Sequence, residues 1–545
     1  MNHTIALWIE NVKDKDLLEE LYSLSENERR ERFFNDLTFG TGGLRGIIGV
    51  GTNCMNIYTV ARASRGIAAY MKQHKMCKAA ISYDSRKFSR LFAQTAARVF
   101  ASHNIDVLIV KELMPTPFLS FLTREEHCDV GIMITASHNP AQYNGYKVYD
   151  ASGCQITDKT AADISDFISQ ADYFAEKDEP DFDILLASGK IRYCNDAVEE
   201  KYLDGIRKTV DAGTCNVHVT YTALNGTGYR LLPKLLDSAG ITVDLVQEQC
   251  VPDESFTTCT YPNPERAEAL ELGIRYAKKN NSDVLIATDP DADRVGIAVR
   301  HEGKYVRLTG NEVGLLLAEY LLGNLKKKGV DTHRYILVKT IVTTNLAEKI
   351  AERYGAGVIN VLTGFKYIGE QICRLESIGE EDRFLLGFEE SYGYLLGTQV
   401  RDKDALVASL AICKMIAEYK AAGKDLVEAL RDIYNNYGCL VSKLLTYEFK
   451  GSKGIENIKH LMAALRNQGN DCLLSKKVIK FVDYKNQNTG LPKAEVLSYD
   501  LADDVSIIIR PSGTEPLLKI YLMATSEATI DILQKQIDEL IEDYR

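Results

Sequence analysis

The sequence predicts an α/β protein of several domains, in which mainly parallel sheets are followed by a smaller α+β domain. Its 545 residues correspond to about three to four domains of ordinary size. Short apolar runs alternate with amphipathic helical segments along most of the chain, which is the pattern of parallel sheets with helical connections. The C-terminal region has a different order of strand, loop, strand and helix, which favours an α+β domain.

Each expected element has a local signal. Near the N-terminus, Leu17, Leu18 and Leu21 have helical spacing within a charged segment, which predicts helices. Apolar runs predict buried strands at 106–110, 130–134, 283–287, 335–338 and 383–387. Helices are predicted between strands, for example at 90–103 and 311–323. In the C-terminal region, strands are predicted at 505–510 and 517–524, and residues 450–454 are interpreted as the edge of a linker.

Composition and charge argue against several classes of protein. Apolar residues make up 45% and charged residues 26%, which is ordinary for a globular chain. The net charge of −11, without a long basic run, argues against binding to nucleic acid or to an anionic membrane. No apolar run reaches the ~18–20 residues of a membrane span, and the start lacks a signal-peptide pattern, so we expect a cytoplasmic protein. The twelve cysteines include no Cys-x-x-Cys pair and are expected to be reduced, mostly structural thiols.

Three alternating aspartates follow the apolar run at 283–287. In extended backbone, Asp289, Asp291 and Asp293 would point to one side, where their carboxylates repel each other unless a cation lies among them. Oxygen ligands without His or Cys favour Mg²⁺ over zinc. Arg294 follows directly and could bind a phosphate held by that metal. The alternatives are a solvated acidic turn and a structural calcium loop.

A second polar loop follows the apolar run at 130–134. Pro140 fixes its own φ and biases Asn139 away from helix, so the turn that displays Ser137 and His138 is stiff. A serine hydroxyl can hold a phosphoryl group covalently, and histidine carries protons near neutral pH. Because the two residues are neighbours in the sequence, their side chains are expected to diverge, which argues against a protease-like pair. The alternative is a turn or N-cap serine.

The segment that begins at Arg510 has the parts of a phosphate cradle. Arg510 offers a planar fork, Ser512 and Thr514 offer hydroxyls, and Gly513 lets backbone N–H groups approach an anion. The alternative is a plain β-turn.

Further loops could serve the same chemistry. The glycine-rich loop Phe39–Gly46 contains Arg45 but is not a Walker A sequence. Lys147 and Lys403 lie near two of the motifs, although either could be a surface residue. The Glu389–Gly393 segment, with two carboxylates and a hydroxyl, suits a hydroxyl-rich ligand. Together, these features indicate phosphoryl transfer, which needs positioning and charge neutralisation above all.

The four motifs occur in one order that is highly specific. Thr135–Pro140 is similar to the phosphoserine loop of the α-D-phosphohexomutases, and Asp289–Arg294 is similar to their metal loop. Glu389–Gly393 resembles their sugar loop, and Arg510–Pro516 their phosphate loop. The resemblance covers nearly the whole chain and implies four domains around a central cleft, three similar α/β domains and a smaller C-terminal one. The expected limits are 1–205, with an N-terminal helical extension, then 206–312, 313–442 and 443–545.

The resemblance also implies a mechanism. Ser137 would carry the phosphoryl group, with Mg²⁺ bound by Asp289, Asp291, Asp293 and a phosphoserine oxygen. The phosphoserine would donate to the substrate, and the resulting sugar bisphosphate would turn over and return its other phosphate. A sugar 1,6-bisphosphate would therefore act as activator.

Further residues match family positions. Those expected near the reacting groups are Arg45, His138, Lys147 and Lys403. Those expected to bind the substrate are Arg294, Thr363, Gly364, Glu389, Ser391, Arg510, Ser512, Gly513 and Thr514.

The resemblance leaves the sugar open. The Glu-Glu-Ser-Tyr-Gly segment is closer to phosphoglucomutases, so glucose is the first expectation, with mannose and pentose phosphates as alternatives. The chain departs from many relatives at Phe388, where glycine is common, and at Asn225, where some relatives carry histidine. A phosphatase with Asp289 as nucleophile and a non-catalytic sugar-phosphate sensor are remoter alternatives. The protein is expected to be a monomer or homodimer that binds a small phosphosugar.

Overall fold

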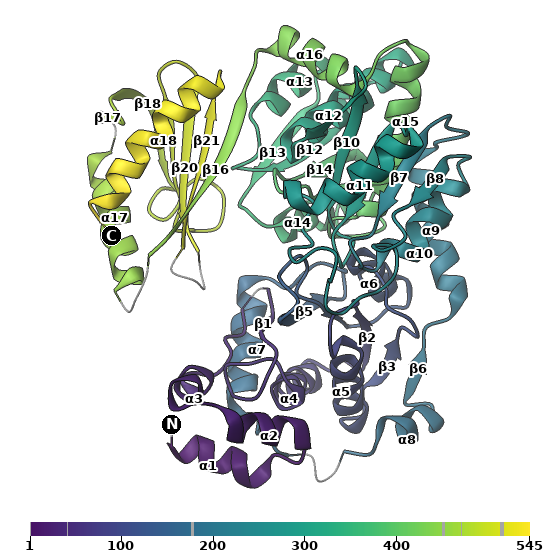
Figure 1. The fold of residues 1–545 in the computed structure, drawn as a ribbon, viewed down its shortest axis with the longest axis vertical. Coiled ribbons are helices and arrows are strands. Elements are labelled where there is room, and N and C mark those ends of the chain that lie inside the picture. Colours follow the sequence, from purple (N-terminus) through teal and green to yellow (C-terminus); the bar gives the residue numbers. More distant parts are fainter. Residues whose placement is uncertain are drawn as a thin grey trace. The chain divides into compact units, whose positions relative to one another are not determined.

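A computed structural model describes residues 2–40, 42–175, 179–449, 453–469, 471–512 and 517–544, and Figure 1 shows its elements. In these ranges the strands form four sheets, three of them accompanied by helices between the strands and the fourth antiparallel. The predicted α/β class with an α+β region at the C-terminus is confirmed. No helix in the described ranges combines the length and the apolar character needed to span a bilayer.

Three helices precede the first sheet, and an aromatic cluster anchors them. The helices are α1 (Asn2–Asn11), α2 (Lys15–Ser23) and α3 (Glu26–Phe33). The ring of Trp8 is fully buried and lies 5.5 Å from that of Phe33 and 5.7 Å from that of Tyr58, measured between centroids. Leu21 of α2 is buried in the same cluster, as its helical spacing predicted.

The first sheet is mixed, with the order β1-β5-β4-β2-β3-β6. Strands β2, β3, β4 and β6 run parallel where they pair, and β5 is antiparallel to both β1 and β4. The strands are β1 (Leu44–Ile47), β2 (Lys78–Tyr83), β3 (Asp106–Ile109), β4 (Val130–Ile134), β5 (Tyr143–Asp150) and β6 (Ile191–Tyr193). The helices are α4 (Ile57–Gln73), α5 (Ser89–Ser102), α6 (Thr116–Glu125), α7 (Asp158–Gln170), α8 (Phe182–Ala187) and α9 (Asp196–Val210). The strands predicted at 106–110 and 130–134 are β3 and β4, and the helix predicted at 90–103 is α5.

The second sheet repeats this design, with the order β11-β10-β9-β7-β8. Strand β7 is parallel to β8 and β9, and β10 is antiparallel to β9 and β11. The strands are β7 (His218–Thr222), β8 (Thr242–Leu245), β9 (Val284–Thr288), β10 (Val295–His301) and β11 (Lys304–Leu308). The helices are α10 (Gly228–Asp237) and α11 (Ala267–Asn280). Every residue of β9, the strand predicted at 283–287, is buried.

The third sheet has the order β13-β12-β14-β15, with β12 parallel to β13. Its strands are β12 (Ile336–Thr340), β13 (Gly357–Val361), β14 (Phe384–Phe388) and β15 (Tyr394–Leu395). The helices of this region are α12 (Gly310–Lys327), α13 (Leu346–Tyr354), α14 (Phe365–Glu376), α15 (Ala405–Ala421) and α16 (Leu426–Tyr437). The runs at 335–338 and 383–387 are confirmed as strands, and 311–323 lies within α12.

The fourth sheet is antiparallel throughout, with the order β16-β21-β20-β19-β18-β17. Its strands are β16 (Val441–Glu448), β17 (Cys472–Leu473), β18 (Lys476–Asp483), β19 (Leu497–Leu501), β20 (Val505–Pro511) and β21 (Leu517–Ala524). The helices α17 (Gly454–Gln468) and α18 (Glu527–Glu542) share its apolar core. Strands β20 and β21 and helix α18 match the predicted order, and residues 450–452 of the predicted linker lie outside the described residues.

The chain divides into two compact units. The first comprises Met1–Gly310, Ile368–Gly387 and Ser391–Asp425, and the second comprises Asn311–Tyr367, Phe388–Glu390 and Leu426–Arg545. The first unit carries the Ser137 and Asp289 loops, and the second carries Glu389 and Arg510.

Candidate active site

The loop after β4 presents Ser137 in a left-handed backbone conformation. Ser137 has a φ of 52°, and its N–H donates to Thr135 Oγ1 at 2.8 Å. Its buried hydroxyl donates to Asp289 Oδ2 at 3.0 Å, and Ser137 Oγ lies 3.2 Å from His138 Nδ1. The expectation that the side chains of Ser137 and His138 diverge is therefore wrong, because the left-handed residue turns its side chain back toward its neighbour.

The loop is held by Arg86, a residue that the sequence reasoning missed. The Arg86 guanidinium is fully buried and donates to the carbonyl oxygens of Ser137 and Asn139, each at 2.5 Å. It also donates to the carbonyl oxygens of Pro140 at 2.9 Å and Tyr143 at 3.1 Å. Asp84 lies beside it, with Oδ2 3.3 Å from Arg86 Nε. The only signal in the sequence is a polar segment directly after the buried strand β2.

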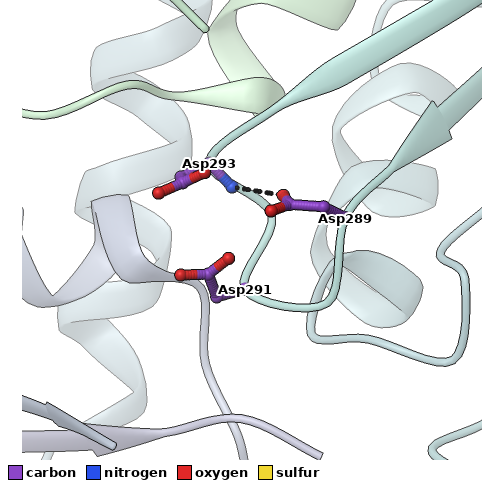
Figure 2. A group of neighbouring side chains, drawn as sticks. All are labelled: Asp289, Asp291 and Asp293. Carbon is purple, nitrogen blue, oxygen red and sulfur yellow. Dashed lines mark hydrogen bonds between the residues drawn. The ribbon is translucent and has the colours of Figure 1, made fainter. Parts of the chain in front are cut away.

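The three aspartates come together on a turn after β9, and Figure 2 shows how they lie. Asp289 Oδ1 accepts from the N–H groups of Asp293 at 3.1 Å and Arg294 at 3.0 Å, and Ala292 has a φ of 50°. One ligand atom from each carboxylate lies within 4.8 Å of the other two. The convergence of the carboxylates is confirmed, but the reasoning from extended backbone is wrong, because a tight turn brings them together.

The carboxylates are crowded and only partly neutralised. Burial and repulsion by Asp291 and Asp293 raise the pKa of Asp289 well above its usual range. Although burial opposes ionisation, Lys147 holds the pKa of Asp291 below its usual range, and their charged atoms lie 2.8 Å apart. Lys403 Nζ lies 3.2 Å from Asp293 Oδ2. The Arg294 Nε lies 3.9 Å from Asp293 Oδ1, so two ammonium groups and one guanidinium face three buried carboxylates.

The same carboxylates fit a divalent cation. Asp291 Oδ1 and Asp293 Oδ1 are buried and have no hydrogen-bond partner within the described residues. Buried carboxylate oxygens left without a partner are costly unless an ion occupies the space between them. Three hard oxygen ligands without nitrogen or sulfur suit Mg²⁺. The group could therefore hold a metal ion, as the sequence predicts.

Two further contacts hold these side chains in place. Thr116, at the start of α6, donates from its hydroxyl to Asp291 Oδ2 at 2.8 Å. The Tyr149 hydroxyl donates to Asp402 Oδ2 at 2.8 Å, and Asp402 Oδ1 accepts from Lys403 Nζ at 3.0 Å. Sequence reasoning missed Thr116, Tyr149 and Asp402, since the contacts of Thr116 with Asp291 and of Tyr149 with Asp402 join residues far apart in the chain.

The remaining predicted residues of the first unit surround the same loops. Arg45 is exposed and donates to Asn139 Oδ1 at 3.3 Å. Arg294 donates to Glu265 Oε1 at 2.8 Å and to the carbonyl oxygen of Ser391 at 3.2 Å. Burial, together with the charges of Arg294 and Arg45, lowers the pKa of His138 well below its usual range. These surroundings therefore favour the neutral imidazole of His138 over its charged form.

The second unit holds three of the residues predicted to bind the sugar, Thr363, Gly364 and Glu389, whereas Ser391 belongs to the first unit. Glu389 is buried, and its Oε1 accepts from the Gly364 N–H at 3.1 Å. Thr363 Oγ1 is buried and has no hydrogen-bond partner in the described ranges. The hydrogen bond between Gly364 and Glu389 thus joins the segment after β13 to the segment after β14.

The predicted phosphate cradle is only partly described. Arg510 lies near the end of β20, and the Ser512 N–H donates to the carbonyl oxygen of Leu517 at 2.7 Å. Gly513 and Thr514 lie outside the described residues. Asn225 stands where some relatives carry histidine. Its side chain donates to the backbone carbonyl oxygens of Glu248 and Val251, each at 2.9 Å, which is a structural role.

Comparison with known proteins gives one consistent result. The alpha/beta/alpha domains I, II and III of phosphoglucomutase/phosphomannomutase match residues 36–174, 200–303 and 309–437, and the C-terminal domain matches 470–540. A phosphoglucomutase of Staphylococcus epidermidis is 34% identical over 554 residues, covering 98% of this chain and 99% of its own. A phosphoglucomutase of Staphylococcus aureus is 34% identical over 549 residues, covering 97% of each chain.

Solved structures agree in fold. The crystal structure of a putative phosphomannomutase from Thermus thermophilus has a TM-score of 0.72 and 22% identity, covering 93% of this chain and 99% of that one. The chain belongs to the phosphoglucomutase/phosphomannomutase family, and the resemblance to the α-D-phosphohexomutases is confirmed.

Proposed function

We propose that this chain is a phosphohexomutase that interconverts hexose 1-phosphate and hexose 6-phosphate, with glucose as the preferred sugar. The observation that carries the proposal is the position of the Ser137 hydroxyl, 3.0 Å from Asp289 Oδ2 at a cluster of three buried carboxylates. A serine held at a metal-binding cluster can carry a phosphoryl group, because the charge of that group is then neutralised where it is transferred.

In this proposal the three aspartates and a phosphoserine oxygen would hold Mg²⁺. When bound, the ion supplies charge neutralisation and a fixed orientation for phosphoryl transfer. Lys147 Nζ lies 2.8 Å from Asp291 Oδ2, and the carboxylates of Asp291 and Asp293 raise the pKa of Lys147 despite its burial. We assign Lys147 a positive charge beside the transferred group.

We assign the movement of the serine proton to His138, whose Nδ1 lies near Ser137 Oγ. The Oγ of the free serine has two acceptors within reach, Asp289 Oδ2 at 3.0 Å and His138 Nδ1 at 3.2 Å. From this distance we assign His138 the role of taking the serine proton when Ser137 attacks the phosphate of a sugar bisphosphate. We propose that Arg45 and Lys403 add positive charge near the Ser137 loop.

The family resemblance assigns the substrate contacts. Glu389 and Ser391 are proposed to bind sugar hydroxyls, with Thr363 and Gly364 beside Glu389. Arg294 is proposed to contact the substrate near the metal loop. The phosphate that does not react is assigned to Arg510, Ser512, Gly513 and Thr514.

The preference for glucose rests on the relatives named phosphoglucomutase, which are 34% identical over nearly the full chain. The sugar-loop sequence points the same way. Domain limits at 205, 312 and 442, and a monomeric or homodimeric state, remain predictions.

The test is a mutase assay with Mg²⁺ and catalytic glucose 1,6-bisphosphate. Glucose 1-phosphate, mannose 1-phosphate and ribose 1-phosphate are supplied separately, and product formation is followed for the natural chain and for Ser137→Ala. We expect the highest kcat/KM for glucose 1-phosphate and a loss of more than ~10⁴-fold in Ser137→Ala, since a nucleophile cannot be replaced by its neighbours.

The matched control is Ser169→Ala, an exposed serine on α7 outside the site, which should keep full activity. Release of inorganic phosphate without isomerisation, unaffected by Ser137→Ala, would instead support an aspartate-based phosphatase. A clear preference for mannose or ribose 1-phosphate would leave the mechanism intact and correct the sugar.

A further inference from the structure

Two cysteines that are far apart in the sequence meet in the first unit. Cys154 lies after β5, Cys373 lies on α14, and they are 219 positions apart. Their sulfur atoms lie 3.7 Å apart, and neither is part of a disulfide. The fold thus brings together two thiols that are far apart in the sequence.

Glycine at position 369 allows this approach. A Cβ atom at Gly369 would lie 2.6 Å from Cys154 Sγ and 2.4 Å from the carbonyl oxygen of Arg401. Gly369 and Cys373 are four residues apart on α14 and so share one face of the helix. The Cys154 side chain thus lies in the gap left by a missing side chain, one turn from Cys373.

The two sulfurs have unequal surroundings. The hydrogen bond from Cys154 lowers the pKa of Cys373, with burial opposing and with Ser152 and the Arg401 guanidinium assisting. The pKa of Cys154 is raised by its hydrogen bond to Cys373 and by burial. Cys373 is half-buried and Cys154 is buried. The two sulfurs are thus close enough to react with each other, and Cys373 is the less buried of the two.

We propose that Cys154 and Cys373 form an oxidisable dithiol, which a peroxide converts into an intramolecular disulfide. The reaction is independent of the mutase chemistry and needs only the fold of the first unit.

The reaction with hydrogen peroxide balances in two steps. The Cys373 thiolate attacks one peroxide oxygen, the O–O bond breaks, and the hydroxide that leaves takes a proton to become water. Cys373 is then a sulfenic acid. The Cys154 sulfur attacks the Cys373 sulfur, the S–S bond forms, and the departing hydroxide takes the Cys154 proton as a second water. A dithiol reductant reverses the reaction by exchange and is itself oxidised to a disulfide.

The experiment uses the reduced, full-length protein exposed to hydrogen peroxide, then blocked with N-ethylmaleimide and digested with trypsin without reduction. Trypsin releases Cys154 in the peptide 148–159 and Cys373 in the peptide 367–374, and each peptide contains one cysteine. We expect mass spectrometry to show these two peptides linked, before the exposed cysteines Cys77, Cys439 and Cys472 are modified. The link should disappear after treatment with dithiothreitol.

Two variants separate the roles of the sulfurs. In Cys154→Ser, the sulfenic acid has no partner and dimedone should label position 373. In Cys373→Ser, dimedone should not label position 154 at the same peroxide dose. As a control for the role of the fold, the protein is oxidised while unfolded in urea. The link between positions 154 and 373 should then be no more frequent than links between other cysteines. Oxidation of the three exposed cysteines with no linked 154–373 peptide, or equal linking in urea, would overturn the proposal.

Discussion

At the scale of single residues, Arg86 is the group that most constrains the serine loop. Its guanidinium reaches four backbone carbonyl oxygens, among them that of Ser137 itself, and it has no access to solvent. A planar fork can serve several carbonyls at once, whereas an ammonium group cannot reproduce that geometry. We infer that Arg86 is a positioning residue that holds Ser137 in its left-handed conformation.

Arg86→Lys should lower kcat for the mutase reaction by about 100-fold, since a displacement of about 1 Å at a reacting group has effects of that size. KM for the sugar phosphate should change little, because the contacts proposed for the sugar lie elsewhere. Steady-state kinetics measure both values, and circular dichroism checks the fold. Arg300→Lys, on a partly exposed ion pair with Asp283, is the matched control. Equal losses in the two variants would contradict a positioning role.

Asp404 gives the protein a pH dependence of stability. It is fully buried at the start of α15, accepts from the Tyr202 hydroxyl at 2.9 Å, and has its pKa raised to about 6 by burial. The folded state therefore binds this proton more tightly than the unfolded state, whose ordinary pKa is 3.8. The resulting contribution to stability is present below about pH 4 and is lost as the pH rises through about 6.

Between pH 4 and pH 7, the natural chain should lose about 2 kcal/mol of unfolding free energy relative to Asp404→Asn. Urea unfolding of both proteins across this range measures the difference. Asp166→Asn, at an exposed position on α7, should show no such change with pH. A difference between the natural chain and Asp404→Asn that stays constant with pH would show that the carboxyl is not protonated in the fold.

At the scale of elements, close packing of α4 against α7 depends on Gly66. A Cβ atom added there would lie 2.6 Å from the Ile168 Cα and 2.7 Å from its backbone nitrogen. Backbone atoms cannot rotate away as a side-chain end can, so the two helices would have to separate. Helices α4 and α7 can thus pack this closely because residue 66 has no side chain.

Gly66→Ala should lower the unfolding free energy by about 1–3 kcal/mol despite the higher helix propensity of alanine. Gly323→Ala is the matched control, since this helical glycine on α12 has only the Tyr354 hydroxyl near the added Cβ, at 3.3 Å. It should stay within about 1 kcal/mol of the natural chain. Thermal unfolding compares the two. Unchanged stability in Gly66→Ala would mean that α7 shifts without cost.

At the scale of the whole molecule, the proposed metal ion links catalysis to stability. Three carboxylates on one buried turn, two of them with unpartnered oxygens, are less favourable without a cation than with one. An ion that binds only the folded protein stabilises it, by about 2.7 kcal/mol at a concentration one hundred times its Kd.

Mg²⁺ should therefore raise the melting temperature of chelator-treated protein and restore its mutase activity, while Asp291→Asn should lose both responses. Differential scanning calorimetry with and without Mg²⁺ gives a readout that does not depend on turnover. Asp166→Asn should respond like the natural chain. An equal rise in melting temperature for Asp291→Asn would place the effect of Mg²⁺ at another site.

Much of the fold could be predicted because its signals are local. Apolar runs such as 130–134 and 283–287 coincide with β4 and β9, since a strand buried on both faces needs apolar residues throughout. The polar motifs could be located because each directly follows one of these apolar runs. The course of the backbone within a motif was harder to predict, as the turn at Asp289–Asp293 illustrates, because a left-handed alanine has no sequence signal.

The α/β class and the family could be predicted from the sequence alone, and so could the position of the Ser137 and Asp289 loops after their strands. These depend on hydrophobic patterning and on short motifs, which can be recognised within a few residues. Three contacts could be found only in the folded structure: Arg86 with the Ser137 loop, Ser137 with His138, and Cys154 with Cys373. These contacts join residues through the packing of sheets and helices or through an unusual backbone angle, and neither leaves a periodic pattern in the chain.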